Sequence, residues 1–199
     1  MKIAIIKYNA GNIQSVSFAL DRLGVEHIIT SDPEEIKSAD KVIFPGVGEA
    51  STTMKYLKEQ KLDELILSLK QPVLGICLGM QLMCKHSEEG NVDCLGIFDE
   101  EVKKFQLPEN NTENIKVPQM GWNTIGNTKS ALFDSSIEDQ FVYFVHSFYV
   151  ALGNDTAATT NYILPYSSAL QKDNFYATQF HPEKSGDVGS KILANFIKL

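Results

Sequence analysis

The chain has 199 residues, of which 43% are hydrophobic, and its formal net charge is −7 at pH 7. That is enough apolar material for one domain with a buried core and too little for two, so we expect residues 1–199 to form a single domain. The acidic balance argues against a broad surface for nucleic acid or anionic membranes, and no apolar window approaches the length of a membrane span. We therefore expect a soluble protein with neither kind of partner.

Cysteine usage and the first residues bear on the compartment. The three cysteines, Cys77, Cys84 and Cys94, are an odd and sparse set, which does not indicate a disulfide framework and favours a reducing environment. The apolar stretch from Ile3 to Ile6 is too short for the hydrophobic region of a signal peptide. We expect a cytoplasmic protein.

The first half of the chain alternates predicted strands with predicted helices. Apolar runs predict strands over residues 2–7, 25–30, 41–45 and 72–76. Helical patterns follow them, from Asn12 to Gly24, from Asp32, over 50–70 and over 78–86. Asn12 and Asp32 are the expected N-caps of the first two helices, and Gly24 is the expected end of the first. This alternation is typical of βαβ units and predicts a mostly parallel sheet with helices on both faces.

The second half changes character, because predicted strands follow one another without long helices between them. They cover residues 101–107, 140–150, 157–163, 167–172 and 174–180, with 172–174 as a hairpin turn. Residues 108–118 predict a polar surface loop, and residues 186–199 a final amphipathic helix. The sequence therefore indicates an α/β fold with antiparallel strands in its second half.

Residues 71–81, QPVLGICLGMQ, place a cysteine between a predicted strand and a predicted helix. Gly-x-Cys-x-Gly in this setting is the layout of a nucleophile elbow, a sharp turn that lifts the central side chain above the sheet and leaves no room for neighbouring β-carbons. The start of a helix also favours thiolate over thiol. Cys77 is therefore predicted to be a nucleophile. From this motif alone, the alternative is a structural cysteine in a tight turn.

A thiolate nucleophile needs a proton-transfer partner, and the chain has four histidines. His181 follows the apolar strand FYATQF, and Glu183, two residues later, can fold back and fix the tautomer of its imidazole. His27 and His86 are interpreted as structural or solvated, His86 at a helix end, and His146 is left open. The predicted catalytic triad is Cys77, His181 and Glu183.

Acyl transfer also needs hydrogen-bond donors for the oxyanion. The backbone N–H of Leu78, directly after the nucleophile, is one candidate. A second should come from a loop at the end of a neighbouring strand, and FPGVGEA (residues 44–50) is such a loop, with glycines that let backbone approach a ligand. The alternative for this loop is an ordinary glycine turn between a strand and a helix.

Together, the segments GICLGMQ, PGVG and HPEKS resemble the class I (triad) glutamine amidotransferases. Four further segments narrow the resemblance to the glutaminase subunits of imidazole glycerol phosphate synthases, in histidine biosynthesis. They are NAGNIQSV (9–16), KVPQMGWN (116–123), YFVHSFY (143–149) and ATQFHPEKS (177–185). The resemblance covers nearly the whole chain and implies the single-domain, flavodoxin-like amidotransferase fold.

The resemblance implies a role for each matching position. Cys77 attacks the side-chain amide of L-glutamine, His181 passes a proton to the leaving ammonia, and Glu183 orients His181. The backbone of Val47 and Leu78 forms the oxyanion hole after a rearrangement of the loop, so that the lone subunit is nearly inactive. Glutamine is held by Gly46, Gly48, Gln81, Glu89, Ser147 and Phe148. Two positions depart from the family pattern: Gln119 stands where histidine is common, and Phe148 where tyrosine is common.

The resemblance also implies a partner, a cyclase subunit with a (β/α)8-barrel fold in a heterodimer. Ammonia released to neutral water becomes mostly ammonium, which is no nucleophile, so hydrolysis is useful only if ammonia is passed on. The implied interface residues are Asn12, Trp122, Tyr143 and Lys184; for Trp122 the alternative is a core tryptophan. The chain has no Walker-type loop and no dinucleotide fingerprint, and we expect no cofactor and no metal.

Three other functions remain open from the sequence. The chain could be the amidotransferase subunit of another pathway, of the anthranilate or aminodeoxychorismate type, although GMQ and MGWN argue against it. It could be a stand-alone cysteine hydrolase, which would need no partner. It could also be a non-catalytic binding subunit with the same fold, against which the intact triad argues.

Overall fold

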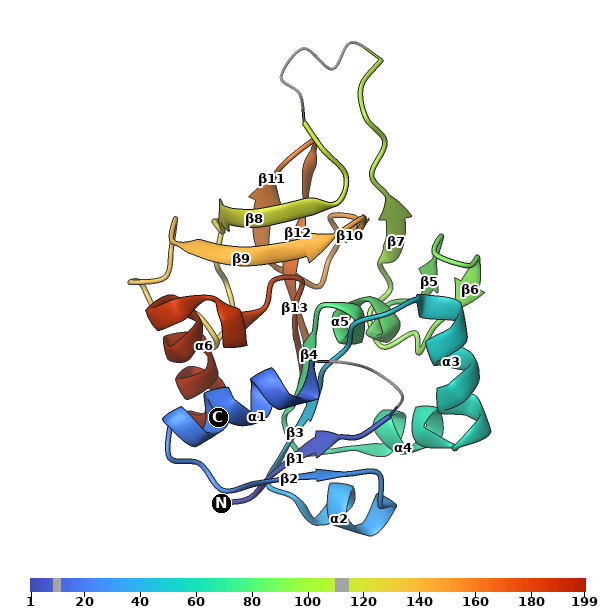
Figure 1. Ribbon diagram of the computed structural model, residues 1–199, viewed down its shortest axis with the longest axis vertical. Coiled ribbons are helices and arrows are strands. Elements are labelled where there is room, and N and C mark those ends of the chain that lie inside the picture. The colour runs from blue at the N-terminus through green and yellow to red at the C-terminus, as the bar shows by residue number, and fades with distance from the viewer. Residues whose placement is uncertain (9–11, 110–114) are drawn as a thin grey trace.

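A computed structural model describes residues 1–8, 12–109 and 115–199 of the chain. Residues 9–11 of the motif at 9–16 and residues 110–114 of the expected surface loop lie outside this description. The described residues form one large mixed sheet, a two-stranded ribbon, and helices on both sides of the sheet (Figure 1). The strands of the large sheet run in the order β2-β1-β3-β4-β13-β12-β10-β7-β5-β6, with β11 paired to β12.

The first half of this sheet is parallel, as the sequence predicts. It consists of β2 (His27–Thr30), β1 (Ile3–Ile6), β3 (Lys41–Phe44), β4 (Val73–Ile76) and β13 (Phe175–Thr178). The remaining strands are β12 (Pro165–Lys172), β11 (Thr156–Asn161), β10 (Phe148–Val150), β7 (Glu101–Lys104), β5 (His86–Ser87) and β6 (Val92–Asp93). They pair antiparallel except for β5 with β7, and β12 returns to β13 through the predicted hairpin.

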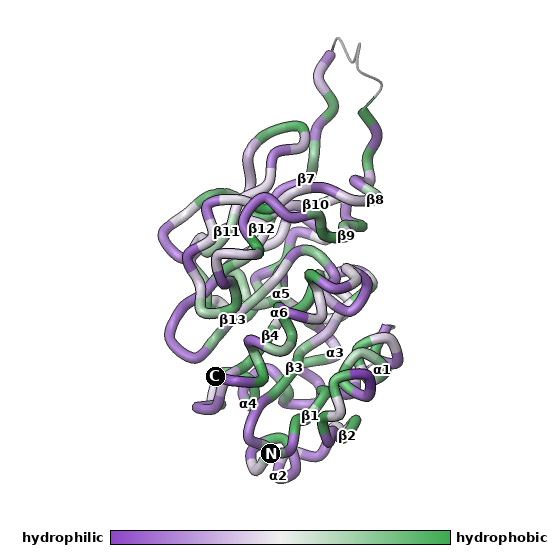
Figure 2. The backbone as a smooth tube through the Cα atoms, turned by 90° about the vertical axis from the view of Figure 1, so that its left-hand side faces the viewer, coloured by the Kyte–Doolittle hydropathy of each residue, from purple (hydrophilic) through white to green (hydrophobic). Residues whose placement is uncertain are grey.

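Helices and the ribbon divide between the two faces. One face carries α1 (Ile13–Arg22), α6 (Gly186–Lys198) and the ribbon of β8 (Gln119–Thr124) and β9 (Phe141–His146). The other carries α2 (Pro33–Ser38), α3 (Ala50–Glu59), α4 (Leu62–Ser68) and α5 (Leu78–Met83). Each face therefore has its own hydrophobic core, and β1 contributes to both. Ile3 and Ile5 pack in the core on the side of α1 and α6, and Ala4 and Ile6 pack in the core on the side of α2 to α5. Figure 2 shows β1, β3 and β4 as hydrophobic stretches within a more polar envelope.

Two of the expected helix signals are confirmed. The carboxylate of Asp32 accepts hydrogen bonds from the backbone N–H groups of Glu34 and Glu35, at 2.9 and 3.0 Å. Gly24 follows α1 with φ 68°, a conformation that glycine adopts without strain. Within the described residues, no helix combines the length and the apolar character that a membrane span needs.

The single helix expected over 50–70 is wrong. The chain turns at Gln60 and Lys61, where Lys61 has φ 56°, and continues as α4. Met54 and Leu57 of α3 and Leu62 of α4 lie in the same core. The turn returns the second apolar segment to the sheet, which a straight helix would carry away from it.

The helix expected over 78–86 is also too long. It ends at Met83, because residues after the turn supply donors to its last carbonyls: Leu95 N–H bonds to Leu82 and Ile97 N–H to Met83, each at 2.9 Å. His86, expected at a helix end, lies instead in β5.

The strand expected over 140–150 is two strands, β9 and β10, which turn at Ser147 and enter different sheets. Strand β8 was not predicted, because Gly121 and Asn123 have weak strand propensity. Its hydrogen-bonded partner, β9, lies in a later part of the chain. The ribbon of β8 and β9 forms one wall of the site described next.

Candidate active site

The backbone at Cys77 forms the sharp turn that the elbow motif predicts. Cys77 has φ 54° and ψ −109°, an unfavourable conformation for a residue with a side chain, and α5 begins at the next residue. A β-carbon on Gly79 would lie 2.0 Å from the carbonyl oxygen of Phe44, and one on Gly75 would lie 3.1 Å from the backbone of Gly79. Gly79 is therefore required by backbone packing, and a side chain at position 75 would be crowded by Met83 and Gly79.

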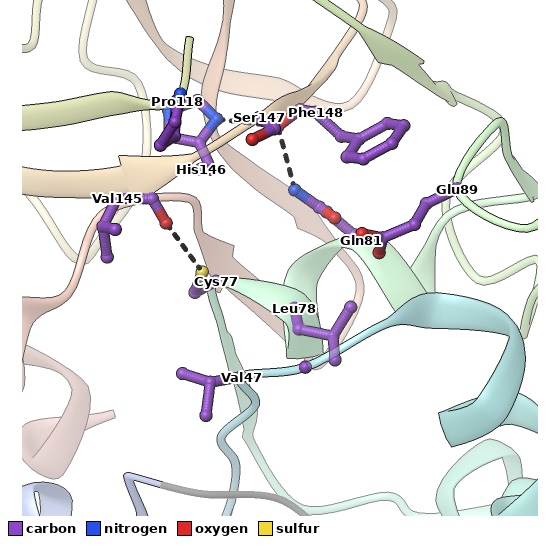
Figure 3. A pocket seen from close by; sticks show the side chains of 11 residues that line it. Val47, Cys77, Leu78, Gln81, Glu89, Pro118, Val145, His146, Ser147 and Phe148 are labelled. Carbon is purple, nitrogen blue, oxygen red and sulfur yellow. Dashed lines mark hydrogen bonds between the residues drawn. The ribbon is translucent and has the colours of Figure 1, made fainter.

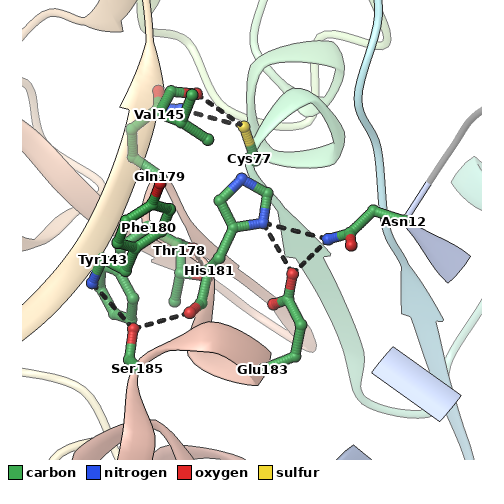
Figure 4. Close-up of polar contacts among 10 residues, drawn as sticks. All are labelled: Asn12, Cys77, Tyr143, Val145, Thr178, Gln179, Phe180, His181, Glu183 and Ser185. Atoms are coloured by element: carbon green, nitrogen blue, oxygen red, sulfur yellow. Dashed lines mark hydrogen bonds and ion pairs between the residues drawn. The ribbon is translucent and has the colours of Figure 1, made fainter. Parts of the chain in front are cut away.

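The parallel pairing of β13 with β4 brings the second half of the chain to this turn. Cys77 N–H donates to the carbonyl of Thr178 at 2.7 Å, and three residues later His181 N–H donates to Tyr143 of β9 at 2.9 Å. The imidazole of His181 is fixed between these strands, and Figure 4 shows its ring directed toward the Cys77 sulfur.

Glu183 lies on a 3-10 turn, Pro182–Lys184, and its Oε1 is 2.7 Å from His181 Nδ1. Because a carboxylate only accepts, Nδ1 carries the proton and Nε2 is left for Cys77. Both side chains are buried, and Nε2 makes no hydrogen bond within the described part of the chain, although the His181 ring faces the Cys77 sulfur (Figure 4). The structure thus brings the three predicted triad residues together.

The electrostatics of this cluster favour an ion pair. Burial alone lowers the pKa of His181, but the adjacent Cys77 thiolate and the Glu183 carboxylate outweigh burial and raise it to about 10. A protonated imidazole in turn stabilises the thiolate. By contrast, burial raises the pKa of Cys84, and it raises that of Cys94 to about 12, so these two thiols are poor nucleophiles.

Asn12 has a role that the sequence did not predict. It precedes α1 with φ 68° and makes no side-chain cap, so the expected capping is wrong. Its side-chain amide instead donates to Oε1 of Glu183 and lies 3.4 Å from Nδ1 of His181. The backbone of Asn12 is left-handed rather than extended as at a usual N-cap, which explains why its side-chain oxygen does not cap the helix.

Two further groups approach the Cys77 sulfur. The carbonyl oxygen of Val145 lies 3.9 Å from it and the side-chain Nε2 of Gln179 lies 3.8 Å from it (Figure 4). Gln179 was not predicted as a site residue. The available signal was a glutamine within the otherwise mainly apolar segment FYATQF; the structure shows its side chain to be fully buried.

The predicted oxyanion donors are not both available in this conformation. Leu78 N–H donates to the carbonyl oxygen of Gly46 at 3.3 Å, so a loop carbonyl occupies that donor. The loop is also held by Tyr8, whose hydroxyl donates to the carbonyl of Pro45. A β-carbon on Gly46 would lie 2.5 Å from that hydroxyl and 2.9 Å from Gly79 N, so the loop lies tightly against the elbow.

A cavity of about 330 Å³ opens above the nucleophile (Figure 3). It is lined by Val47, Gly48, Cys77, Leu78, Gln81, Glu89, Pro118, Val145, His146, Ser147 and Phe148. Five of the six predicted glutamine-binding residues are among them; Gly46 is not. The sequence did not predict Pro118, Val145 or His146 as lining residues. A cavity of this size suits a small polar ligand.

Side chains of the cavity wall are already engaged with protein. Gln81 Nε2 donates to the carbonyl of Phe148 at 3.0 Å and to Oε1 of Gln179 at 2.9 Å. Glu89 accepts a hydrogen bond from Ala50 N–H at 2.9 Å, and burial raises its pKa. Gln81 therefore has only its Oε1 to offer a ligand, as an acceptor.

Behind the wall lies a buried polar network centred on His146. Its Nδ1 donates to the carbonyl of Phe148 at 2.7 Å, and its Nε2 lies 3.3 Å from the hydroxyl of Tyr166, which also contacts Gln119 at 3.0 Å. Burial lowers the pKa of His146 to about 4. This histidine is therefore neutral and structural, and Gln119 belongs to the wall's support and is buried rather than on a partner-facing surface.

The outer side of the ribbon is apolar and exposed. We call Met120, Trp122, Phe141, Tyr143 and Val145 the ribbon face. Along β9 these residues alternate with buried ones, and Tyr143 and Val145 are partly exposed. Trp122 is 55% exposed, so the alternative of a core tryptophan is wrong. Its ring lies 6.0 Å from that of Tyr143, and Tyr143 N–H bonds to Ser185, next to the exposed Lys184. The four predicted interface residues thus lie around one end of the triad.

Comparison with known proteins adds to this geometry. The family described as "Glutamine amidotransferase class-I" matches residues 5–199. The chain is 66% identical to imidazole glycerol phosphate synthase subunit HisH of Bacteroides thetaiotaomicron, with both chains covered completely. It is 46% identical to the same subunit of Haemophilus influenzae, with 100% of this chain and 98% of that one covered.

Solved structures agree on the fold. A putative GMP synthase protein from Thermoplasma acidophilum superposes with a TM-score of 0.75 at 23% identity, covering 100% of this chain and 92% of the other. A second structure, described as a glutamine amidotransferase, gives a TM-score of 0.73 at 18% identity, with 98% and 97% covered.

Proposed function

Because the chain belongs to the class I glutamine amidotransferase family, we propose that it is the glutaminase subunit of an imidazole glycerol phosphate synthase. In this function it hydrolyses L-glutamine to glutamate and ammonia, and it passes the ammonia to a cyclase subunit of histidine biosynthesis. The observation that carries the proposal is the convergence of the Cys77 sulfur, the His181 imidazole and the Glu183 carboxylate, with Cys77 lining a cavity, in a chain 66% identical to a subunit of that name over its full length.

The first half-reaction forms a thioester. In the ion pair the Cys77 proton is on His181 Nε2, and the sulfur electron pair attacks the side-chain carbonyl carbon of glutamine. The tetrahedral oxyanion needs two N–H donors, those of Leu78 and Val47. As it collapses, the C–N bond breaks and His181 returns the proton to the leaving nitrogen, which departs as ammonia.

The second half-reaction repeats these roles with water. His181 takes a proton from water, the resulting oxygen nucleophile attacks the thioester, and the C–S bond breaks to give glutamate and the Cys77 thiolate. Glu183 keeps the same tautomer of His181 in both halves. The sum is glutamine and water to glutamate and ammonia.

The oxyanion hole must open before either half-reaction is fast. Leu78 N–H is engaged by the carbonyl of Gly46, so the peptide between Gly46 and Val47 has to turn over, removing the carbonyl and presenting Val47 N–H. Gly48, with φ 129°, is a neighbouring position where the backbone can absorb such a rotation. We expect the chain alone to hydrolyse glutamine slowly and a docked partner to accelerate it.

The ribbon face is the proposed docking surface for the cyclase. It is apolar and aromatic, and it borders the triad, because Val145 contacts the Cys77 sulfur and Tyr143 bonds to the turn that carries His181. In the complex, a (β/α)8-barrel subunit would cover it, receive the ammonia unprotonated and make imidazole glycerol phosphate and aminoimidazole carboxamide ribotide. Asn12 and Lys184 extend the surface around the triad.

The test is the division of labour between the two subunits. In the complex, Cys77→Ala should abolish cyclase turnover supplied by glutamine and leave turnover supplied by ammonium salts unchanged. Loss of both activities in a correctly assembled complex would refute the proposal. High glutaminase activity of the isolated chain would favour a stand-alone hydrolase instead, and capture of a different synthase would favour another pathway.

A further inference from the structure

Gln179 connects the cavity wall to the nucleophile. Its side chain is fully buried, its Oε1 lies 2.9 Å from Gln81 Nε2, and its own Nε2 lies 3.8 Å from the Cys77 sulfur, within hydrogen-bond range for sulfur. The backbone explains this position, because Cys77 N–H bonds to the carbonyl of Thr178, the last residue of β13, and Gln179 follows it directly.

The orientation of the Gln179 amide follows from hydrogen-bond chemistry. The carbonyl oxygen of Phe148 has no hydrogen, so the end of Gln81 that lies 3.0 Å from it must be the NH2 group. The other hydrogen of that NH2 group points at Gln179, which must therefore present its oxygen. The NH2 group of Gln179 is then left facing the Cys77 sulfur. A backbone carbonyl thus determines the orientation of two amides in series.

The two polar neighbours of the sulfur favour opposite protonation states. The carbonyl of Val145, 3.9 Å away, can accept a hydrogen bond from the thiol but repels a thiolate. The amide of Gln179 cannot accept at its nitrogen and favours the thiolate. When the proton passes to His181 and the electron pair stays on sulfur, the donor from Gln179 becomes the favourable contact.

We propose that Gln179 is a further catalytic residue whose side-chain N–H stabilises the sulfur anion of Cys77, in an orientation imposed by Gln81. The inference rests on the proposed function for its catalytic meaning. Gln81 then has two roles. It lines the cavity, where a ligand can contact it, and it is hydrogen-bonded to Gln179, the donor to the Cys77 sulfur.

The experiment measures the thiolate without glutamine and without a partner. The rate at which iodoacetamide alkylates Cys77 is followed against pH, and the rate of Cys77→Ala is subtracted to remove reaction at the other cysteines. Gln179→Met preserves the length of the side chain and removes the donor. We expect the midpoint of its alkylation profile to move up by about one pH unit, which corresponds to about tenfold less thiolate at a given pH below the midpoint.

Two further variants test whether a shift in Gln179→Met is due to the lost donor. Gln171→Met makes the same chemical change on the neighbouring strand β12 and should leave the midpoint where it is. Gln81→Met keeps Gln179 but removes the group that orients its amide, so it should shift the midpoint in the same direction by a smaller amount. If Gln179→Met does not fold, the Gln81→Met profile decides on its own.

An unchanged midpoint in folded Gln179→Met, or in Gln81→Met if that is the decisive variant, would overturn the proposal and leave Gln179 as a buried structural amide. The outcome is independent of the proposed function. A protein that hydrolyses no glutamine would still show the shift if the contact is correct, and a true glutaminase without this contact would show none.

Discussion

The two walls of the cavity are built on different physical principles. The elbow wall, from β4 and α5, is fixed by backbone contacts so close that a β-carbon on Gly79 would lie 2.0 Å from the Phe44 carbonyl. The ribbon wall, from β9 and its turn at Ser147, is supported by buried side-chain hydrogen bonds among His146, Tyr166 and Gln119. The first wall excludes alternatives by steric clash, and the second depends on every polar group keeping its partner and protonation state.

This difference predicts different responses to change. The elbow wall should fail completely when one atom is added and should respond little to pH. The ribbon wall should tolerate added atoms on its exposed side, yet respond to acid. Substitutions in each wall and away from both can break or sharpen this contrast, and we take them in order of expected size.

The largest effect is expected at the elbow. Gly79→Ala should lower the free energy of unfolding by at least about 4 kcal/mol, since neither the Phe44 carbonyl nor α5 can move without disrupting the packing of α5 against the centre of the sheet. Chemical unfolding monitored by circular dichroism measures it. The control is Gly96→Ala, at φ 67° with no atom within 4 Å of its new β-carbon, which should cost only about 1 kcal/mol. Equal losses in the two variants would contradict steric fixation.

The second effect is the acid sensitivity of the ribbon wall. Burial lowers the pKa of His146 from 6.5 to about 4, so between these values the unfolded chain binds a proton that the folded chain does not. Stability is therefore fully present above pH 6.5 and is lost as the pH falls toward 4, by about 3 kcal/mol at this site.

Urea unfolding at a series of pH values measures this loss. His146→Gln removes the titrating group, and its stability should fall less steeply across the same range, although its stability at neutral pH is lower. An acid limb with the same slope in both proteins would show that His146 does not govern the wall.

The third effect concerns the exposed side of the ribbon. Trp122→Ala should weaken binding of the proposed cyclase partner by about 2 kcal/mol, or roughly 30-fold in Kd, since tryptophan is a frequent interface anchor. Because Trp122 is 55% exposed, the stability of the free chain should change by no more than about 0.5 kcal/mol. Titration calorimetry and thermal unfolding separate the two. Leu67→Ala, on the exposed side of α4 across the sheet, should leave affinity unchanged.

The smallest effect lies in the parallel half, away from the cavity. Lys61 holds φ 56° at the break between α3 and α4, so Lys61→Gly should stabilise the fold by up to about 1 kcal/mol. Lys55→Gly, inside α3, should instead destabilise it by about 1 kcal/mol. A loss of stability in Lys61→Gly would mean that its side chain contributes contacts that outweigh the strain.

The predictability of each wall follows from the same contrast. Close backbone packing requires particular residue types at neighbouring positions, and these can be recognised in the sequence. The glycines around Cys77, the cap at Asp32 and the strand–helix alternation could therefore be predicted. The pairing of His181 with Glu183 could also be predicted, because only Pro182 separates them and their chemistry is complementary.

The ribbon wall could not be predicted from short sequence motifs, because it depends on hydrogen bonds between distant residues. Gln119, His146 and Tyr166 are far apart in the chain. The identity of a polar residue also does not show whether it is buried or exposed. The role of Gln179 is equally hidden, because its partners Gln81 and Cys77 lie far earlier in the chain. The position of Asn12 before a helix predicts a cap, whereas its actual partner, Glu183, lies far along the chain. The turn at Lys61 escaped because periodicity reports which residues are apolar but not where the helix axis changes direction.

The exposed ribbon face has a consequence for how a cell must make this protein. Three large apolar side chains, Met120, Trp122 and Phe141, each more than half exposed, stand together on one short ribbon. Copies of this chain that bind no partner expose this apolar surface, which favours self-association and degradation. Under the proposed function, synthesis matched to that of the cyclase partner, rather than excess of this chain, therefore keeps the molecule dispersed.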